Sequence, residues 1–255
     1  MAAIGEPARG PTKEVPPSGA ALIHLTGEFQ LLVDGGRMPV PHSVERFLAF
    51  LALANRPCSR ARIAGTLWGE VADERASGNL RTALWRLNQA GPRLVLAEDD
   101  RLALASEVRV NALELGDLMR RLTGADPGAL DQLPALLEGI DLLPDWEDEW
   151  VAADRERFRL LRLEALERAA EMLIERAELG RALEAALAAT QAEPFRESAR
   201  RLQVRVHLAE GNLAEALHAF ATYRDLLVTE IGLEPSSAMF DLVRPLLERQ
   251  VAAAG

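Results

Sequence analysis

The stretch Asp73-Glu-Arg-Ala-Ser-Gly-Asn-Leu-Arg-Thr-Ala-Leu-Trp-Arg-Leu-Asn-Gln89 has the pattern of an amphipathic helix. At about 100° per residue, the apolar face consists of Ala76, Leu80, Ala83, Leu84 and Leu87. The opposite face carries arginines and small polar groups, namely Arg75, Gly78, Thr82, Trp85, Arg86 and Gln89, with Ser77 and Arg81 at its side. This pattern predicts a helix that packs on a core through one face and presents arginines to solvent through the other.

The segment after this helix predicts a β-hairpin. Pro92 ends the helix, and two largely apolar runs, 93–97 and 101–105, flank the polar turn Glu98-Asp-Asp100. A helix-turn-helix followed directly by a hairpin is the order of elements in a winged helix.

The residues before the helix supply the rest of such a domain. Asp34-Gly-Gly36 between apolar runs predicts an earlier hairpin. Two helices are then expected, one from Ser43 to Ala54 and one from Arg60 to Trp68, with Ser43 and Ser59 as their N-caps. The order strands, three helices, hairpin predicts a winged helix-turn-helix domain.

The polar face of residues 73–89 has the chemistry of a helix that enters a DNA major groove. Arginine forks and short polar side chains reach phosphates and guanine edges there. For the helix alone, the alternative is a solvated amphipathic helix with no ligand. The candidate DNA-binding residues are Ser59, Arg60, Arg75, Ser77, Gly78, Arg81, Thr82, Trp85, Arg86 and Arg101.

These candidates have different expected roles. Arg81 and Arg86 are expected to reach phosphate or guanine, while Ser77 and Thr82 lie against base edges and Gly78 lets the backbone approach the groove. The start of the second helix, Ser59 and Arg60, offers a phosphate contact. For Trp85 two roles are open, stacking on a sugar or packing against the hairpin, and packing is the preferred interpretation.

The charge is divided unevenly along the chain. Residues 21–105 hold 10 Arg against nine Asp and Glu, a net charge of +1. Residues 106–255 hold 17 Arg against 28 Asp and Glu, a net charge of −11. The first part is therefore suited to a polyanion if its arginines gather on one side, whereas the second part is expected to be repelled by one.

Several classes of protein are disfavoured by composition and motifs. The Gly-, Pro- and Ala-rich residues 1–20 predict a disordered tail in place of a signal peptide, and no apolar run reaches the ~18 residues of a membrane span. A lone Cys58 fits a reducing cytoplasm. The scattered histidines and the missing phosphate-binding and nucleophile motifs predict no metal, no cofactor and no enzymatic activity. The acids Asp145, Glu147, Asp148 and Glu149 are interpreted as the first turn of a helix and not as a catalytic cluster.

The second half predicts a stack of helices. A long helix is expected over 150–179, ended by Gly180, and shorter ones over 111–122, 126–139, 182–192, 197–209, 213–230 and 236–250. Ala182-Leu183 and Ala216-Leu217 stand 34 residues apart, which is the tetratricopeptide (TPR) period. Such helix pairs bury their apolar faces only by stacking, and the stack creates a surface for a protein partner.

Three blocks in the first half and three in the second carry a resemblance to a known family. They are Gly27-Glu-Phe-Gln-Leu31, Leu67-Trp-Gly69 and Ala76–Leu87, then Leu142-Leu-Pro144 with Trp150-Val151, Ala216–Arg224 and Glu230–Pro235. In this order the chain resembles the SARP family of bacterial transcriptional activators. The resemblance implies an α+β protein, with an OmpR-type winged-helix DNA-binding domain over 21–106 and a TPR-like bacterial transcriptional activator domain over 107–255.

The family resemblance also implies partners. It implies double-stranded DNA bound as direct repeats near the −35 element of a promoter, a possible homodimer on that DNA, and contact with RNA polymerase holoenzyme. A different class of function is a TPR-type adaptor whose winged helix no longer binds DNA, which the acidic turn Glu98-Asp-Asp100 would allow. Ion pairs that tie the helix arginines to Glu70, Asp73 and Glu74 would favour the adaptor.

Overall fold

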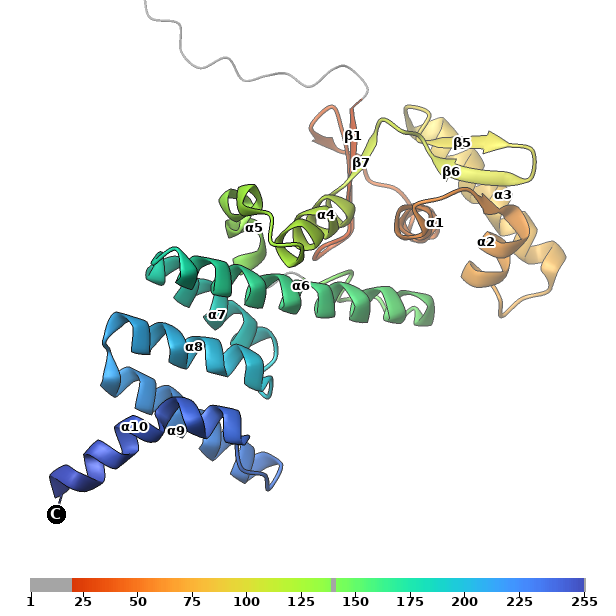
Figure 1. The fold of residues 1–255 in the computed structure, drawn as a ribbon. Coiled ribbons are helices and arrows are strands. Elements are labelled where there is room, and N and C mark those ends of the chain that lie inside the picture. Colours follow the sequence, from red (N-terminus) through yellow and green to blue (C-terminus); the bar gives the residue numbers. More distant parts are fainter. Residues whose placement is uncertain (1–19, 139–140, 255) are drawn as a thin grey trace, which may run out of the picture. The chain divides into compact units, whose positions relative to one another are not determined.

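The computed structural model describes residues 20–138 and 141–254, and the tail expected over 1–20 lies outside these residues except for Ala20. The chain divides into two compact units. One contains residues up to Leu25 together with Phe29–Asn111, and the other contains Thr26–Glu28 together with Ala112–Gly255. The first is a winged helix and the second is helical, so the α+β fold with a winged helix ahead of a helical domain is confirmed (Figure 1).

The first unit begins with a small sheet of order β3-β2-β1-β7. Its strands are β1 (Ala21–His24), β2 (Gln30–Val33), β3 (Gly36–Arg37) and β7 (Val108–Val110). β2 is antiparallel to β1 and β3, whereas β7 runs parallel to β1. The predicted turn at Asp34-Gly-Gly36 joins β2 to β3, with positive φ angles of 50° at Asp34 and 78° at Gly35.

Three helices and a second sheet complete the winged helix. The helices are α1 (His42–Ala54), α2 (Arg60–Leu67) and α3 (Asp73–Ala90). The second sheet has the order β4-β6-β5, with β4 (Cys58–Ser59), β5 (Val95–Glu98) and β6 (Arg101–Leu104). We call residues 95–104, the β5–β6 hairpin, the wing. The core of the unit is aliphatic and aromatic, and its fully buried side chains include Ile23, Leu25, Phe47, Leu48, Leu51, Ile63, Leu67, Leu87, Leu94 and Leu102.

The two predicted serine caps differ in outcome. The Ser59 hydroxyl accepts a hydrogen bond from the Arg62 amide at 3.3 Å and caps α2 as predicted. The Ser43 prediction is wrong, because α1 begins one residue earlier and its N-cap is Pro41, which has no side-chain cap. The Pro41 carbonyl accepts the amides of Val44 and Glu45, so this helix starts without a hydroxyl partner.

The second unit is a stack of helices (Figure 1). It opens with α4 (Asn111–Thr123), the 3-10 helix η1 (Pro127–Gln132) and α5 (Pro134–Leu137). The stack follows with α6 (Glu149–Glu175), α7 (Leu179–Ala192), α8 (Glu197–Glu210), α9 (Leu213–Glu230) and α10 (Ser237–Ala254). Helices α7 and α9 begin 34 residues apart, which is the predicted repeat, and Ala182 and Ala216 are both fully buried. No helix in the described ranges is long and apolar enough to cross a membrane.

The end of α6 differs from the prediction. The helix stops at Glu175, and Gly180 lies inside α7 and does not end α6. Ala177 takes the left-handed conformation with φ of 58°, while the Glu178 amide donates to the Leu173 carbonyl at 2.9 Å. A backbone cap of this kind satisfies the last carbonyls of a helix, and here a non-glycine residue provides it.

Arginines of α6 hold the loop that precedes it. The Arg155 guanidinium donates to the carbonyls of Leu142 (2.9 Å), Leu143 (2.6 Å) and Trp146 (3.0 Å). The guanidinium of the buried Arg162 donates to two carbonyls at the end of α5, those of Leu136 and Glu138. Burial lowers the pKa of Arg162 from its usual value. The several N–H donors of a guanidinium thus let one side chain bond more than one backbone carbonyl of this loop.

Acidic residues of the cluster before α6 lie at the N-terminus of that helix. Asp148 is the N-cap residue of α6, and its carboxylate accepts a hydrogen bond from the indole of Trp150 at 3.0 Å. The rings of Trp146 and Trp150 meet edge to face, with centroids 6.4 Å apart. Glu149 lies in the first turn, where negative charge meets the positive end of the helix.

Candidate nucleic-acid interface

Helix α3 has the two faces that its sequence pattern predicts. Ala76, Leu80, Ala83 and Leu87 are buried, with Leu87 fully so. Leu84, the fifth residue of the predicted apolar face, is only half-buried and borders a surface hollow. The inward face anchors α3 to the core of the winged helix and so fixes the direction of the opposite face.

The arginines of α3 are available for a ligand. Arg75, Arg81 and Arg86 are exposed. Within the described part of the chain, no ion pair joins them to Glu70, Asp73 or Glu74, or to any other carboxylate. Arginines left uncompensated on one helix face are suited to phosphates and to guanine O6 and N7.

The small residues of this face are partly engaged. The Thr82 hydroxyl donates to the Gly78 carbonyl at 3.0 Å, so its oxygen still has acceptor capacity for a base amino group. Ser77 and Gly78 are half-buried. A Cβ built on Gly78 would lie 3.7 Å from the Arg81 Nη2 atom, an ordinary contact, so packing within the protein does not require glycine there.

Trp85 is not packed in the way that the sequence favoured. Its side chain is 63% exposed, the largest exposure among the described large apolar residues. The preferred interpretation, packing against the hairpin, is therefore wrong, because the indole leaves the helix on the solvent side. The other role, stacking on a sugar, stays a prediction.

The start of α2 is tied to the wing through its backbone. The Arg60 amide donates to the Asp100 carbonyl at 2.9 Å, and Ser59 lies opposite Arg101 in the β4–β6 pair. Since the Ser59 hydroxyl already caps α2, two of the polar groups at this helix terminus have partners. The Arg60 guanidinium is left as the group that can reach a phosphate. The Arg101 guanidinium makes a long hydrogen bond, 3.5 Å, to the Pro57 carbonyl.

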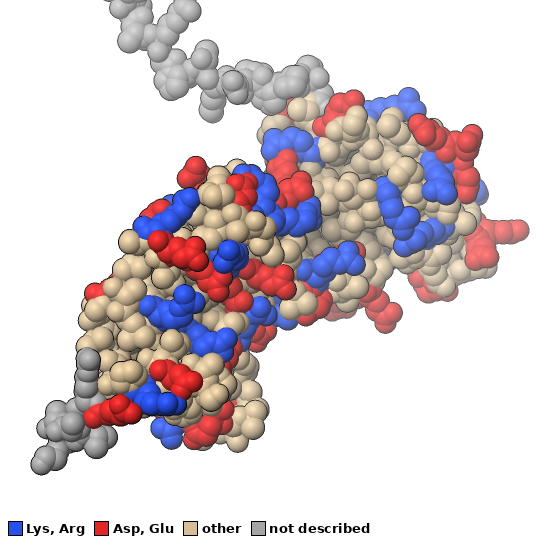
Figure 2. Space-filling view, viewed as in Figure 1, with Lys and Arg blue, Asp and Glu red and all other residues tan. Residues whose placement is uncertain are grey.

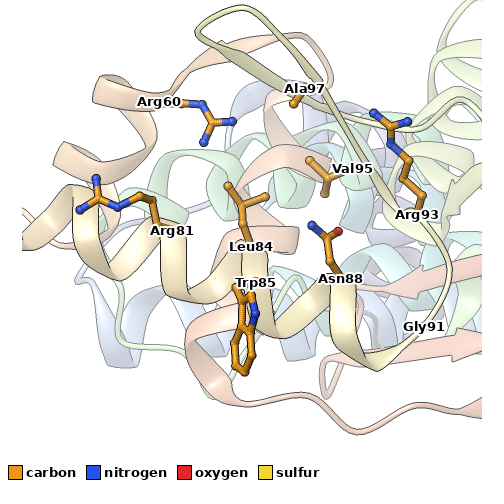
Figure 3. A pocket seen from close by; sticks show the side chains of 9 residues that line it. All are labelled: Arg60, Arg81, Leu84, Trp85, Asn88, Gly91, Arg93, Val95 and Ala97. Atoms are coloured by element: carbon orange, nitrogen blue, oxygen red, sulfur yellow. The ribbon is translucent and has the colours of Figure 1, made fainter.

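An open hollow of about 620 Å³ lies between α3, the start of α2 and the wing (Figure 3). It is bordered by three arginines, an amide and apolar side chains, which are Arg60, Arg81, Leu84, Trp85, Asn88, Gly91, Arg93, Val95 and Ala97. Sequence analysis missed Asn88 and Arg93 as site residues. Arg93 lies between the helix and the strand β5, so only the path of the chain brings it to the same hollow as Arg60 and Arg81.

The charge on the wing is opposite to that on α3. Glu98, Asp99 and Asp100 are all exposed at the hairpin turn, where Asp99 has a φ of 50°. In the face shown in Figure 2, blue and red groups are interspersed over both units, and neither unit presents one sign alone. A surface of this kind is expected to bind DNA weakly when the sequence is wrong.

The fold defines the class of the protein, one that pairs a winged helix with a TPR-like helical domain. Residues 129–247 match the bacterial transcriptional activator domain. This domain match, together with the relatives described next, supports the resemblance to the SARP family of bacterial transcriptional activators.

The relatives are regulatory proteins. The chain is 28% identical over 253 residues to the regulatory protein AfsR of Streptomyces coelicolor, which covers 93% of this chain and 25% of that protein. It is 27% identical over 208 residues to AfsR of Streptomyces griseus, with 78% of this chain and 21% of that protein covered. The chain thus spans about a quarter of the length of these relatives.

A solved structure shares the fold. Mycobacterium tuberculosis EmbR, in complex with a low-affinity phosphopeptide, superposes with a TM-score of 0.71 at 20% identity. The match covers 91% of this chain and 66% of that one. The arrangement of a winged helix ahead of a helical domain is therefore common to both proteins.

Proposed function

We propose that the chain is a sequence-specific DNA-binding activator of transcription, with residues 21–106 as its DNA-binding domain and residues 107–255 as its activator domain. On this proposal α3 enters the major groove, and Arg75, Arg81 and Arg86 meet phosphates and guanines. The chain acts beside the chromosome in the bacterial cytoplasm, without a cofactor and without enzymatic activity.

One observation carries the proposal. The outward arginines of α3 are held by no ion pair among the described residues, while the inward face is buried. A TPR-type adaptor that had lost DNA binding would have no need to keep three arginines uncompensated on one helix. Carboxylates that could neutralise them, Asp73 and Glu74, lie in the first turn of the same helix and are exposed.

The test is binding of the purified chain to duplexes selected from a random-sequence library, titrated with salt. We expect the double variant Arg81→Ala, Arg86→Ala to lose selective binding, since an arginine removed from a base costs on the order of 1 to 3 kcal/mol. The matched control is Arg157→Ala, Arg205→Ala, which removes two exposed arginines from the helical unit. Equal binding by the three proteins would overturn the proposal.

The manner of activation is proposed from the family. Two protomers lie side by side on direct repeats close to a promoter and contact RNA polymerase holoenzyme. Transcription in vitro from a template that carries the selected repeats upstream of a promoter tests this. More transcript with the wild-type chain than with the Arg81→Ala, Arg86→Ala protein supports activation, and less transcript supports a repressor.

A further inference from the structure

Three cations border the hollow beside α3. Arg60 begins α2, Arg81 lies on α3, and Arg93 lies in the segment between α3 and β5. Figure 3 shows Arg60 and Arg81 on one side of the hollow and Arg93 on the other. No ion pair in the described part of the chain engages any of the three. An anion that enters the hollow therefore meets positive charge from both sides without displacing a carboxylate.

The lining between the arginines is apolar and contains one amide. Leu84 and Val95 point into the space, and Asn88 lies between them and Arg93 (Figure 3). The backbone of DNA has the same alternation, because anionic phosphates are separated by apolar deoxyribose faces. Arginine and asparagine side chains are common partners of phosphate oxygens.

The tip of the wing has the opposite chemistry. Its exposed Glu98, Asp99 and Asp100 place three carboxylates where a wing would have to enter a minor groove, whose potential is strongly negative. The one arginine nearby, Arg101, lies directly across the strands from Glu98, and its guanidinium is turned to the Pro57 carbonyl. The tip is therefore repelled from the groove, while the base of the wing is attracted to the backbone.

We infer that the DNA backbone crosses the base of the wing, through the hollow bordered by Arg60, Arg81 and Arg93, and that the tip of the wing stays outside the minor groove. This rests on the proposed DNA binding and adds Arg93 as a residue that positions a phosphate. On this inference only α3 recognises the base sequence. The wing adds to the affinity for DNA through its base and not through its tip.

The experiment compares two single variants of the full chain, Arg93→Ala and Arg101→Ala, which remove one arginine from the base and one from the tip-side end of the same hairpin. Binding is measured to a library-selected duplex and to an unrelated duplex over a range of salt concentrations. We expect Arg93→Ala to weaken binding to both duplexes and to lower the slope of log K against log salt by about 0.9, the value for one phosphate contact. Arg101→Ala is expected to leave the slope unchanged, because on this inference Arg101, whose guanidinium is bonded to the Pro57 carbonyl, is no longer among the candidate DNA-binding residues.

Chemical footprinting gives an independent readout. Methylation by dimethyl sulfate is expected to show guanine N7 protected in the major groove under α3, with adenine N3 in the flanking minor groove still reactive. Loss of slope in Arg101→Ala but not in Arg93→Ala, or protection of flanking adenine N3, would overturn the inference while leaving DNA binding intact. Absence of wild-type binding to any selected duplex would instead overturn the proposed function, and this inference with it.

Discussion

Gly78 lies within α3, where glycine costs helix stability and no close contact in the protein requires it. A Cβ at this position would have only the Arg81 side chain within 4 Å, at 3.7 Å. The residue is therefore in a position where folding alone would favour alanine. The proposed approach of this helix face to DNA gives the position a reason to stay small.

We predict that Gly78→Ala stabilises the chain by up to about 1 kcal/mol, the difference in helix propensity, and weakens DNA binding. Chemical denaturation and the duplex titration measure the two effects on one protein. A variant that gains stability and keeps full affinity would show that Gly78 does not face the DNA backbone.

Gly69, just after α2, is constrained in the opposite way. Its Cβ would lie 2.6 Å from the Gly65 carbonyl oxygen, which belongs to the backbone and cannot turn aside. We predict that Gly69→Ala destabilises the chain by on the order of 1 to 3 kcal/mol, the cost of forced overpacking. Gly65→Ala is the matched control, because nothing lies within 4 Å of its Cβ, and it should be neutral or stabilising in the same denaturation experiment. Equal midpoints for the two variants would contradict the prediction.

At the scale of elements, Glu197 links the start of α8 to the start of α10. Its carboxylate accepts hydrogen bonds from the Ser236 amide (2.8 Å), the Ser236 hydroxyl and the Arg201 guanidinium (2.7 Å). Burial of this carboxyl pushes its pKa upward, but the hydrogen bonds from Ser236 and Arg201 together bring the pKa below its usual value of 4.5. The ionised form is therefore favoured in the folded state.

A lowered folded-state pKa stabilises the fold at pH values above the unfolded pKa, and this contribution is lost as pH falls through the folded value. We therefore predict that Glu197→Gln lowers the unfolding midpoint at neutral pH and flattens its dependence on pH below 4.5. Glu215→Gln, an exposed carboxylate of α9, is the control. If both variants keep the wild-type dependence on acid, then Glu197 does not link the helices energetically.

Periodicity in the sequence predicts most of the helices and strands. The residues at which they begin and end are harder to predict from the side chains alone. The apolar stripe of α3 and the 34-residue repeat follow from spacing alone, since each element must bury one face. The end of α6 does not follow, because Ala177 takes the left-handed conformation that glycine usually provides. A backbone hydrogen bond determines where α6 ends, and the side chains at this point do not predict it.

The residues of the candidate site show the same difference between what periodicity predicts and what it does not. The arginines of α3 were found from helix periodicity, because one helix fixes their direction. Arg93 was missed because its place across the hollow from Arg60 depends on how the wing folds back on the start of α2. The exposure of Trp85 was also misjudged, since an indole on a polar helix face is equally compatible with a neighbouring strand and with solvent.

At the scale of the whole molecule, the division of charge bears on how protomers share DNA. The helical half has a net charge of −11 against +1 for residues 21–105, so one chain has little attraction to DNA beyond its α3 and its hollow. On the proposed function, selective binding therefore depends on more than one protomer per site. Protomers on direct repeats must face the same side of the duplex, which fixes the spacing at multiples of about 10.5 bp.

We predict that inserting about 5 bp, half a helical turn, between two selected repeats abolishes cooperative binding, whereas inserting about 10 bp restores part of it. Titration of duplexes with one repeat, two repeats and the two altered spacings measures this. Single-repeat affinity is the internal control, because it is not expected to change. Cooperativity that is indifferent to the 5 bp insertion would show that the protomers do not lie side by side on one face.

The parallel pairing of β1 with β7 has a consequence for the order in which the protein is made. Ala21 lies opposite Val108, and the Leu25 amide is bonded to the Asn111 side chain at 2.8 Å, so the first strand of the winged helix closes against nearly its last residues. During synthesis, one edge of β1 stays open until Val110 has left the ribosome. Contacts of such long sequence separation form late. The winged-helix unit therefore cannot finish folding before synthesis of the helical half has begun.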